Sequence, residues 1–184
     1  MMTLMAIGIQ PGQSYESREK PIHAKITVCV QATVQTTSAE GIASRIFSGI
    51  GVRIDWRHGQ KCPGDAVTVT LTGDTPDSVL PEALACALPY EGSHIRVFYD
   101  RLNDPRYFPK LIVPTLLGHV MAHEIGHILQ GTSQHSETGM MKAKWTAVDF
   151  AAMTFEPLRF TQADIDLIES GLAKRSAAVH RGAN

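Results

Sequence analysis

The sequence predicts an α/β fold in which helices pack against a mostly parallel, twisted sheet. Strand-like and helix-like segments alternate along the chain, in the order strand, helix, two strands, a hairpin and two helices. The first strand-like segment is an unbroken apolar and β-branched run, which is typical of strands in parallel sheets. The chain has 184 residues, of which 43% are hydrophobic, enough for one domain with a substantial core.

The chain is expected to enter its domain through a strand and a helix. Residues 1–23 are rich in glycine, proline, serine and glutamine, and they predict a flexible arm before a single domain at 24–184. KITVCVQA (25–32) is predicted to be a strand covered on both faces. SAEGIASRIFSGI (38–50) has its apolar residues at helical spacing, and Gly51 is expected to end that helix.

Two further strands and a hairpin complete the predicted sheet. VRIDWR (52–57) and AVTVTLT (66–72) have strand patterns, and the turn-rich loop HGQKCPGD separates them. The segment at 83–101 predicts a hairpin whose first strand, at 83–88, is an antiparallel edge strand. The same stretch, PEALACAL (81–88), is alternatively compatible with a short helix.

Two long helices are predicted after the hairpin. The first begins near Pro114, a residue favoured in a first helical turn, and ends at Gly131. The second, TQADIDLIESGLAKR (161–175), is amphipathic, with Thr161 as its N-cap and Asp164 completing a box-like start. The first of these helices carries the residues that bear most directly on function.

The charge balance excludes two classes of partner. Seventeen basic and eighteen acidic residues give a formal charge of -1, without a run of like charges. We therefore expect no binding to nucleic acid or to an anionic membrane surface. The longest apolar stretch, 111–129, contains three histidines and a glutamate, so it does not predict a transmembrane helix. The N-terminus lacks the basic region of a signal peptide, and the compartment stays open.

The three cysteines cannot all pair within one chain, and none lies in a CxxC motif. Cys29 lies in an apolar run and predicts a buried core thiol. Cys62 and Cys86 are expected either to form one disulfide, if the protein is exported, or to stay reduced. A thiolate zinc cluster is therefore not expected.

The stretch HVMAHEIGHILQGTSQHSETGMM (119–141) holds four of the eight histidines. His123 and His127 stand four residues apart on the predicted helix, so their imidazoles project from one face, one turn apart. That separation suits two ring nitrogens binding the same Zn²⁺. Glu124 is offset by about 100° around the helix, so it reaches past the metal as general base without being a ligand. His119 lies one turn further back, too far to share the metal, and is expected in the core.

A hydrolytic zinc site usually takes a third protein ligand. Gly131 can end the helix, and the chain can then turn back so that His135 reaches the metal. Glu137 is the main competitor, because a carboxylate serves equally well, and Asp149 and Glu156 are more distant alternatives. We expect one zinc ion per chain, held by three protein ligands.

This pattern resembles the metzincin zinc peptidases, in which a third histidine follows a glycine and a methionine turn lies beneath the metal. The matching residues are His123, Glu124, His127, Gly131, His135 and the Gly139-Met140-Met141 turn. The resemblance covers about residues 24–141, because the order of the predicted elements before the motif also matches. The usual spacing is H-E-x-x-H-x-x-G-x-x-H. Here the glycine comes one position later and the third histidine two positions later, with Gln130 at the family's glycine position.

The residues after the third histidine carry a second resemblance. The continuation H-S-x-x-G-x-M-x-A-x-W, here from His135 to Trp145, is similar to that of a group of uncharacterised bacterial proteins. Met141 is identified as the methionine of the turn, with Met140 as the alternative. Trp145 is expected to be a core aromatic residue rather than a wall of the pocket.

The metzincin resemblance implies a zincin-like fold and a zinc-dependent peptidase, and we expect a monomer acting on a peptide or protein substrate. Zinc would activate a water molecule, and Glu124 would take its proton and deliver it to the leaving amine. An extended substrate would pair with the edge strand at 83–88. Two alternatives stay open: a metal-binding module without peptidase activity, and a zinc hydrolase of a small amide.

Overall fold

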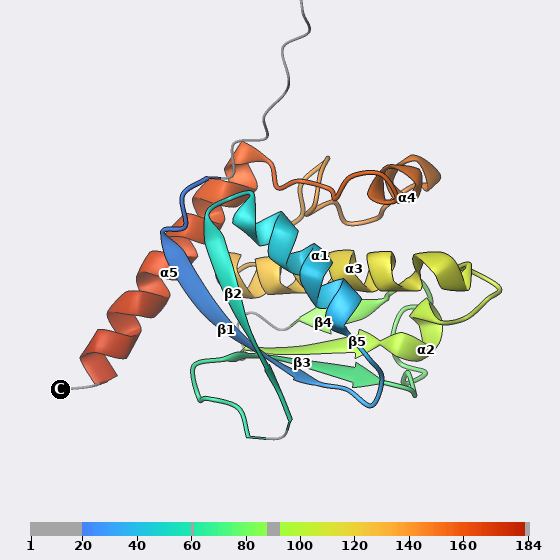
Figure 1. The fold of residues 1–184 in the computed structure, drawn as a ribbon, viewed down its shortest axis with the longest axis horizontal. Coiled ribbons are helices and arrows are strands. Elements are labelled where there is room, and N and C mark those ends of the chain that lie inside the picture. Colours follow the sequence, from blue (N-terminus) through green and yellow to red (C-terminus); the bar gives the residue numbers. More distant parts are fainter. Residues whose placement is uncertain (1–19, 60, 88–92, 183–184) are drawn as a thin grey trace, which may run out of the picture.

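The computed structural model describes residues 20–59, 61–87 and 93–182 (Figure 1). The predicted arm at residues 1–23 lies outside the described residues up to residue 19. At its described end, the backbone N–H of His23 donates a hydrogen bond to Gly51 O at 2.9 Å. The chain is thus attached to the domain directly before its first strand.

The sheet has five strands in the order β2-β1-β3-β5-β4. β1 (Ala24–Gln31) pairs in parallel with β2 (Val52–His58) and β3 (Val67–Thr72), and β3 pairs in parallel with β5 (His94–Phe98). β4 (Ala85–Ala87) is antiparallel to β5 and forms one edge of the sheet. The mostly parallel sheet and its antiparallel edge strand are confirmed, and the short-helix alternative at this edge is wrong.

Two long helices lie against the sheet, and a third packs along the end of one of them (Figure 1). α1 (Thr37–Ser48) and α3 (Val113–Gln130) contact each other and the sheet, and α5 (Gln162–Gly182) contacts α3. The helices at these three places were predicted. Three short helical segments were not: α2 (Tyr99–Leu102), η1 (Lys110–Ile112) and α4 (Ala147–Met153).

β1 is covered on both faces only beyond its first half. Ile26 and Val28 face the core and are buried, whereas Lys25 is exposed and Thr27 is half-buried. Cys29 is fully buried because the loop after β2 folds back over it and is joined to it. The expectation of a strand covered on both faces is therefore wrong for the first half of β1, where Lys25 is exposed and Thr27 is only half-buried.

The turn between α1 and β2 depends on glycine. α1 ends at Ser48, slightly earlier than predicted, and Gly49 is its cap residue. Gly51 has a φ of 78°, and a Cβ atom on it would lie 2.5 Å from His23 Nδ1. Only glycine fits this combination of left-handed backbone and close approach. The residue predicted to end the helix thus serves the entry into β2.

α3 is the central helix of the domain, and nearly all of its residues are buried. It begins at Val113, places Pro114 in its first turn, and ends at Gln130. Gly131 then adopts a left-handed conformation with a φ of 68°, and its N–H donates to His127 O. Both ends agree with the prediction. No helix among the described residues combines the length and apolarity of a membrane span.

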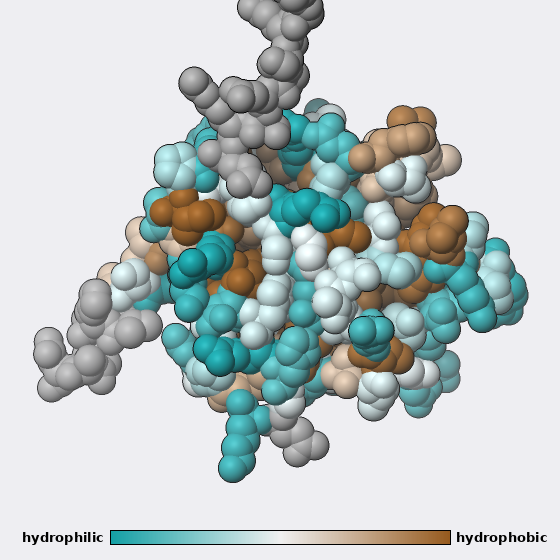
Figure 2. Space-filling view, viewed as in Figure 1, coloured by the Kyte–Doolittle hydropathy of each residue, from teal (hydrophilic) through white to brown (hydrophobic). Residues whose placement is uncertain are grey.

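α4 is an outlying helix with an apolar outer surface. Figure 2 shows apolar residues gathered over α4, on a face where hydrophilic residues predominate. Val148 is 77% exposed, and Phe155, just beyond the helix, is 92% exposed. Phe150 attaches the helix to the domain by packing edge-on against Phe108, with ring centroids 5.7 Å apart. Met153, the last residue of α4, is buried in the hydrophobic core and also anchors the helix.

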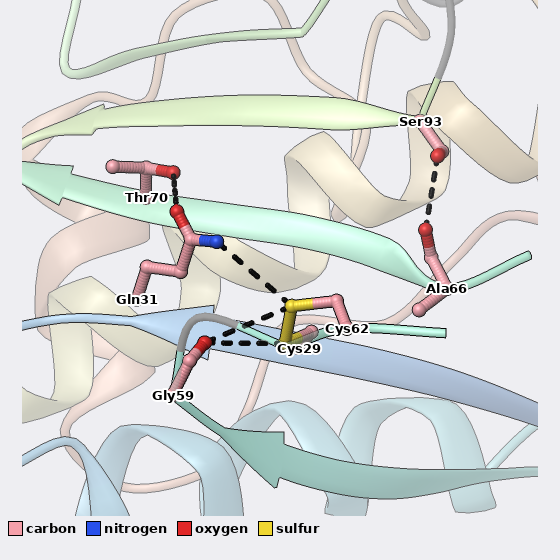
Figure 3. Close-up of a disulfide and its surroundings, with 7 residues drawn as sticks. All are labelled: Cys29, Gln31, Gly59, Cys62, Ala66, Thr70 and Ser93. Atoms are coloured by element: carbon pink, nitrogen blue, oxygen red, sulfur yellow. Dashed lines mark hydrogen bonds between the residues drawn. A yellow bond between two sulfur atoms is a disulfide. The ribbon is translucent and has the colours of Figure 1, made fainter. Parts of the chain in front are cut away.

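A disulfide joins Cys29 of β1 to Cys62 in the loop between β2 and β3 (Figure 3). Their Cα atoms lie 5.8 Å apart, and the loop returns to β1 where Gly59 N–H donates to Val30 O at 3.4 Å. Cys86 is free and exposed on β4, on the far side of β3 and β5 from β1. Both alternatives for Cys62 are therefore wrong, since it neither pairs with Cys86 nor stays reduced. The free core thiol expected at Cys29 is also wrong, although its burial is confirmed.

Breaking this disulfide is expected to lower stability strongly. Cys62→Ser should reduce the free energy of unfolding by about 3–4 kcal/mol, because the crosslink closes a loop with a sequence separation of 33 residues. Urea unfolding of the oxidised protein measures this loss. Cys86→Ser is the matched control and should leave stability unchanged. Titration of the unfolded, unreduced chain should find one free thiol, and three would contradict the assignment.

Candidate metal centre

α3 places the motif residues at the centre of the domain. His123 is 8% exposed, His127 5% and Glu124 9%. The helix is held under the sheet by apolar side chains on its other faces, so the imidazoles cannot turn away without opening the core. Because Gly131 ends the helix directly after this turn, the chain reverses close to His127.

The reversed chain returns His135 to the two helical histidines. His127 Nε2 lies 3.0 Å from His123 Nε2 and 3.2 Å from His135 Nε2. One nitrogen from each ring lies within 4.8 Å of those of the other two. Glu137 is exposed and lies outside this group. The structure thus brings together the three histidines chosen from the sequence.

The downstream acids considered as ligands are engaged elsewhere. Asp149 accepts hydrogen bonds from Lys142 Nζ at 2.7 Å and from Thr146 N–H at 2.6 Å, which caps α4. Glu156 pairs with Arg159 at the surface. Neither carboxylate belongs to the histidine group among the described residues.

The second nitrogen of each helical imidazole fixes its tautomer. His123 Nδ1 lies 2.9 Å from Met140 O, and His127 Nδ1 lies 2.9 Å from Thr132 O. A carbonyl oxygen only accepts, so each Nδ1 carries the hydrogen and each Nε2 presents a lone pair. Lone pairs that face each other at 3.0 Å repel unless a cation lies between them.

A zinc ion fits this donor set. Zinc–nitrogen bonds of about 2.0–2.1 Å in a tetrahedral shell place neighbouring nitrogens roughly 3.3 Å apart. The spacings of 3.0 and 3.2 Å between the Nε2 atoms are close to this value. The carbonyls of Met140 and Thr132 are the outer hydrogen-bond partners that metal-binding imidazoles usually have.

Burial keeps the imidazoles in the form that binds metal. It lowers the pKa of His123 to about 4 and the pKa of His127 to about 4. Burial also lowers the pKa of His135, which lies nearer the surface. All three rings are therefore neutral at pH 7 and can donate lone pairs.

Glu124 points from α3 toward the edge of the sheet. Burial raises the pKa of Glu124 to about 7, against the opposing effect of a hydrogen bond from Ala87 N–H in β4. A carboxyl group with a pKa near neutrality can both accept and return a proton at physiological pH. Glu124 is not a member of the three-histidine group.

The segment after His135 packs beneath the helix. Met140 and Met141 are both fully buried. A Cβ on Gly126 would lie 2.7 Å from Met141 Sδ, so this thioether lies directly against the turn that precedes His127. Met140 contributes its carbonyl to His123 instead. Met141 thus packs its side chain against α3, whereas Met140 supplies a backbone hydrogen-bond acceptor to His123.

Trp145 borders the site. It was expected in the core, but it is only half-buried and packs against the core in part. Its ring lies edge-on to His123, with centroids 5.5 Å apart. Among the described residues, its buried Nε1–H has no hydrogen-bond partner. Trp145 therefore forms a wall beside His123 and also contributes to the core.

His119 is a core residue, as expected. It is fully buried, and both of its nitrogens are used: Nδ1 lies 2.8 Å from Thr115 O, and Nε2 accepts the N–H of Leu158 at 3.1 Å. Its tautomer is thus fixed in the same way as that of His123. It ties α3 to the chain that leads into α5.

Three backbone groups that contact the histidines or Glu124 were not identified from the sequence. They are the carbonyls of Met140 and Thr132 and the N–H of Ala87. Every residue except proline carries such groups, so no residue type marks them. The available signals were positional, because Met140 lies in the expected methionine turn and Ala87 in the expected edge strand.

Comparison with known proteins finds a likeness of fold. No family model and no curated protein matches the chain. The archaemetzincin of Methanopyrus kandleri is similar in structure, with a TM-score of 0.53 and 15% identity over 87% of this chain and 98% of that one. The archaemetzincin of Archaeoglobus fulgidus, solved with malonate, has a TM-score of 0.52 and 15% identity over 78% of this chain and 100% of that one. The predicted metzincin-like fold class is confirmed.

Proposed function

Proceeding from an archaemetzincin-like fold, we propose that this chain is a zinc-dependent peptidase. His123, His127 and His135 hold one zinc ion, and Glu124 is the general base. The convergence of three Nε2 atoms carries the proposal, because two of them present lone pairs at 3.0 Å inside a buried site. The acid beside them has a pKa raised by burial to about 7.

The chain's own residues supply proton transfer and orientation. A bound zinc ion supplies Lewis-acid chemistry, which acidifies a water molecule and polarises the scissile carbonyl. Glu124 takes the proton of the attacking water and delivers it to the leaving amine. The backbone N–H of Ala87 in β4 faces this carboxylate and favours its ionised form.

The edge strand favours an extended substrate. Within the described part of the chain, β4 is paired on one side only, with β5. A peptide that pairs with its open side would pass beside Glu124, since Ala87 contacts that carboxylate. The substrate is therefore a peptide or an unfolded segment of a protein. All proposed ligands lie in one chain and in one domain, residues 24–184, so a monomer suffices.

Glu124 distinguishes this proposal from a metal-binding module without activity. A structural zinc site is usually closed by a fourth protein ligand. Among the described residues the group holds three, which leaves a position for water or substrate. A buried acid beside such a position serves proton transfer and contributes nothing to a purely structural site.

Metal content tests the ligand assignment. Elemental analysis of the purified protein should give one zinc per chain, and His123→Ala should abolish it. His94→Ala is the matched control, because this histidine is exposed on β5 and lies outside the group. Two equivalents of zinc, or full retention in the His123 variant, would contradict the assignment.

Hydrolysis is tested with unfolded casein and a panel of quenched peptides. The zinc-loaded protein should cleave them, and a chelator should stop cleavage until zinc is restored. Small amides belong in the same panel. If the small amides are cleaved and the peptides are not, the site belongs to the alternative, a hydrolase of small amides.

Zinc affinity should hardly change between pH 8 and pH 6. Protons compete with zinc for the imidazoles, so affinity is lost as the pH falls through their pKa values. Burial lowers the pKa values of His123 and His127 to about 4. The steep loss of zinc affinity should therefore come below about pH 5. Competition with a chelator, corrected for its own protonation, measures the profile. A loss above ~10-fold between pH 7 and pH 6 would indicate ordinary histidine pKa values instead.

A further inference from the structure

A buried carboxylate outside the metal group connects α5 to the loop of the third histidine. Asp164 lies in the first turn of α5 and is 2% exposed. Its Oδ2 accepts hydrogen bonds from Thr161 N–H at 2.8 Å and from Thr161 Oγ1 at 2.7 Å. Asp164 N–H in turn lies 3.2 Å from Thr161 Oγ1. One oxygen of the carboxylate therefore serves the helix cap.

The other oxygen of Asp164 does not contribute to the cap. Oδ1 accepts the hydroxyl of Ser136 at 2.5 Å, across 28 positions of sequence. Ser136 follows His135 directly, so this bond holds the residue next to the third member of the histidine group. Helix α5, packed against the end of α3, thus reaches the loop by one side-chain contact.

Other attachments of the loop come from backbone N–H groups on both sides of His135. Gln134 N–H donates to Thr132 Oγ1 at 3.2 Å, and Met140 N–H donates to Arg159 O at 2.8 Å. His135 is exposed, as are Gln134 and Glu137 on either side. On the far side of the loop, Ser136 N–H donates to Met141 O at 2.8 Å, which closes a turn. An imidazole on an exposed loop must be ordered before it can bind, and this costs conformational entropy. A bond that orders the loop in advance lowers the cost.

The bond between Asp164 and Ser136 places a carboxylate next to the loop that carries His135.

We propose that Asp164 and Ser136 are positioning residues, which fix His135 as the third ligand and slow the release of the metal. The inference rests on the proposed zinc site. The outer partners of metal ligands typically contribute 10- to 100-fold in metal affinity. The bond between Ser136 and Asp164 acts one step further out, through the backbone of the loop.

The test measures zinc release into an excess of chelator. Ser136→Ala keeps the cap of α5 and removes only the bond to the loop. Release should therefore be faster, by up to ~10-fold, because this bond acts one step beyond the direct partners of the ligands. The melting temperature of the metal-free protein should also fall, because Oδ1 of the buried Asp164 loses its partner, so the release rate is the deciding measurement. Ser136→Thr restores the hydroxyl and should restore slow release.

Thr161→Ala is the matched control. It removes the hydroxyl half of the cap but leaves the bond between Asp164 and Ser136, so it should lower the melting temperature without faster release. The absorption spectrum of the cobalt-substituted protein is a second measurement, and it should change in Ser136→Ala but not in Thr161→Ala.

Two outcomes refute the inference and can be told apart. Equal release rates for Ser136→Ala and the wild type, with zinc bound to both, would refute it alone. A wild-type protein that binds no zinc would refute the proposed function, and this inference with it.

Discussion

Glu124→Gln is expected to lower peptide hydrolysis by ~10²-fold or more while leaving zinc content unchanged. Glutamine is nearly isosteric, and its amide oxygen can still accept the hydrogen bond from Ala87 N–H. It cannot take a proton from water. Because Glu124 lies outside the histidine group, the three proposed ligands remain in place. The turnover number on a quenched peptide and the zinc content are measured on the same preparation.

Glu137→Gln is the control for this variant. Glu137 is an exposed acid two positions beyond His135, and the same substitution there should leave the rate unchanged. An unchanged rate in Glu124→Gln would remove Glu124 from the mechanism. Loss of zinc in that variant would instead make Glu124 a ligand.

His135→Ala is expected to weaken zinc binding by orders of magnitude, whereas Glu137→Ala should have little effect. The Nε2 atom of His135 lies 3.2 Å from that of His127, and the alanine variant leaves only two imidazoles for the metal. Glu137 is exposed and lies outside the group. Zinc titration against a competing chelator gives both affinities. If the two variants exchange their effects, the third ligand is a carboxylate.

The position of the site followed from spacing and from one glycine. The four-residue interval between His123 and His127 has meaning only on a helix, and the helix could be predicted from its apolar residues and its proline start. Gly131 marked the place where the chain reverses, and this made the return of His135 predictable. Local rules sufficed because all three residues lie within one short stretch.

Contacts between distant segments were beyond such rules. The partner of Cys29 depends on how the loop after β2 folds back over β1, and three cysteines allow three pairings. The bond between Ser136 and Asp164 likewise joins segments that are adjacent only after α5 has packed on α3. The cap at Asp164 was predictable, because it is local, but its second partner was not.

Some misses had a local signal. Thr146, the N-cap residue of α4, is followed by Asp149 three positions later. This is the pattern of a capping box, so the helix could have been predicted from the sequence. The burial predicted for the first half of β1 was wrong for another reason. Thr27 is β-branched and reads as part of a buried run, although its hydroxyl tolerates solvent.

The position of Trp145 beside His123 has an optical consequence. The chain has two tryptophans, and the other, Trp56, donates its indole N–H to Ser44 Oγ at 2.9 Å in a different part of the domain. The emission of an indole responds to charge near its ring, and the ring of Trp145 lies 5.5 Å from an imidazole of the proposed centre. In a Trp56→Phe background, the tryptophan fluorescence of the protein would therefore come only from Trp145, beside the histidines. The occupancy of the site would then be read from intrinsic emission, without a dye and without turnover.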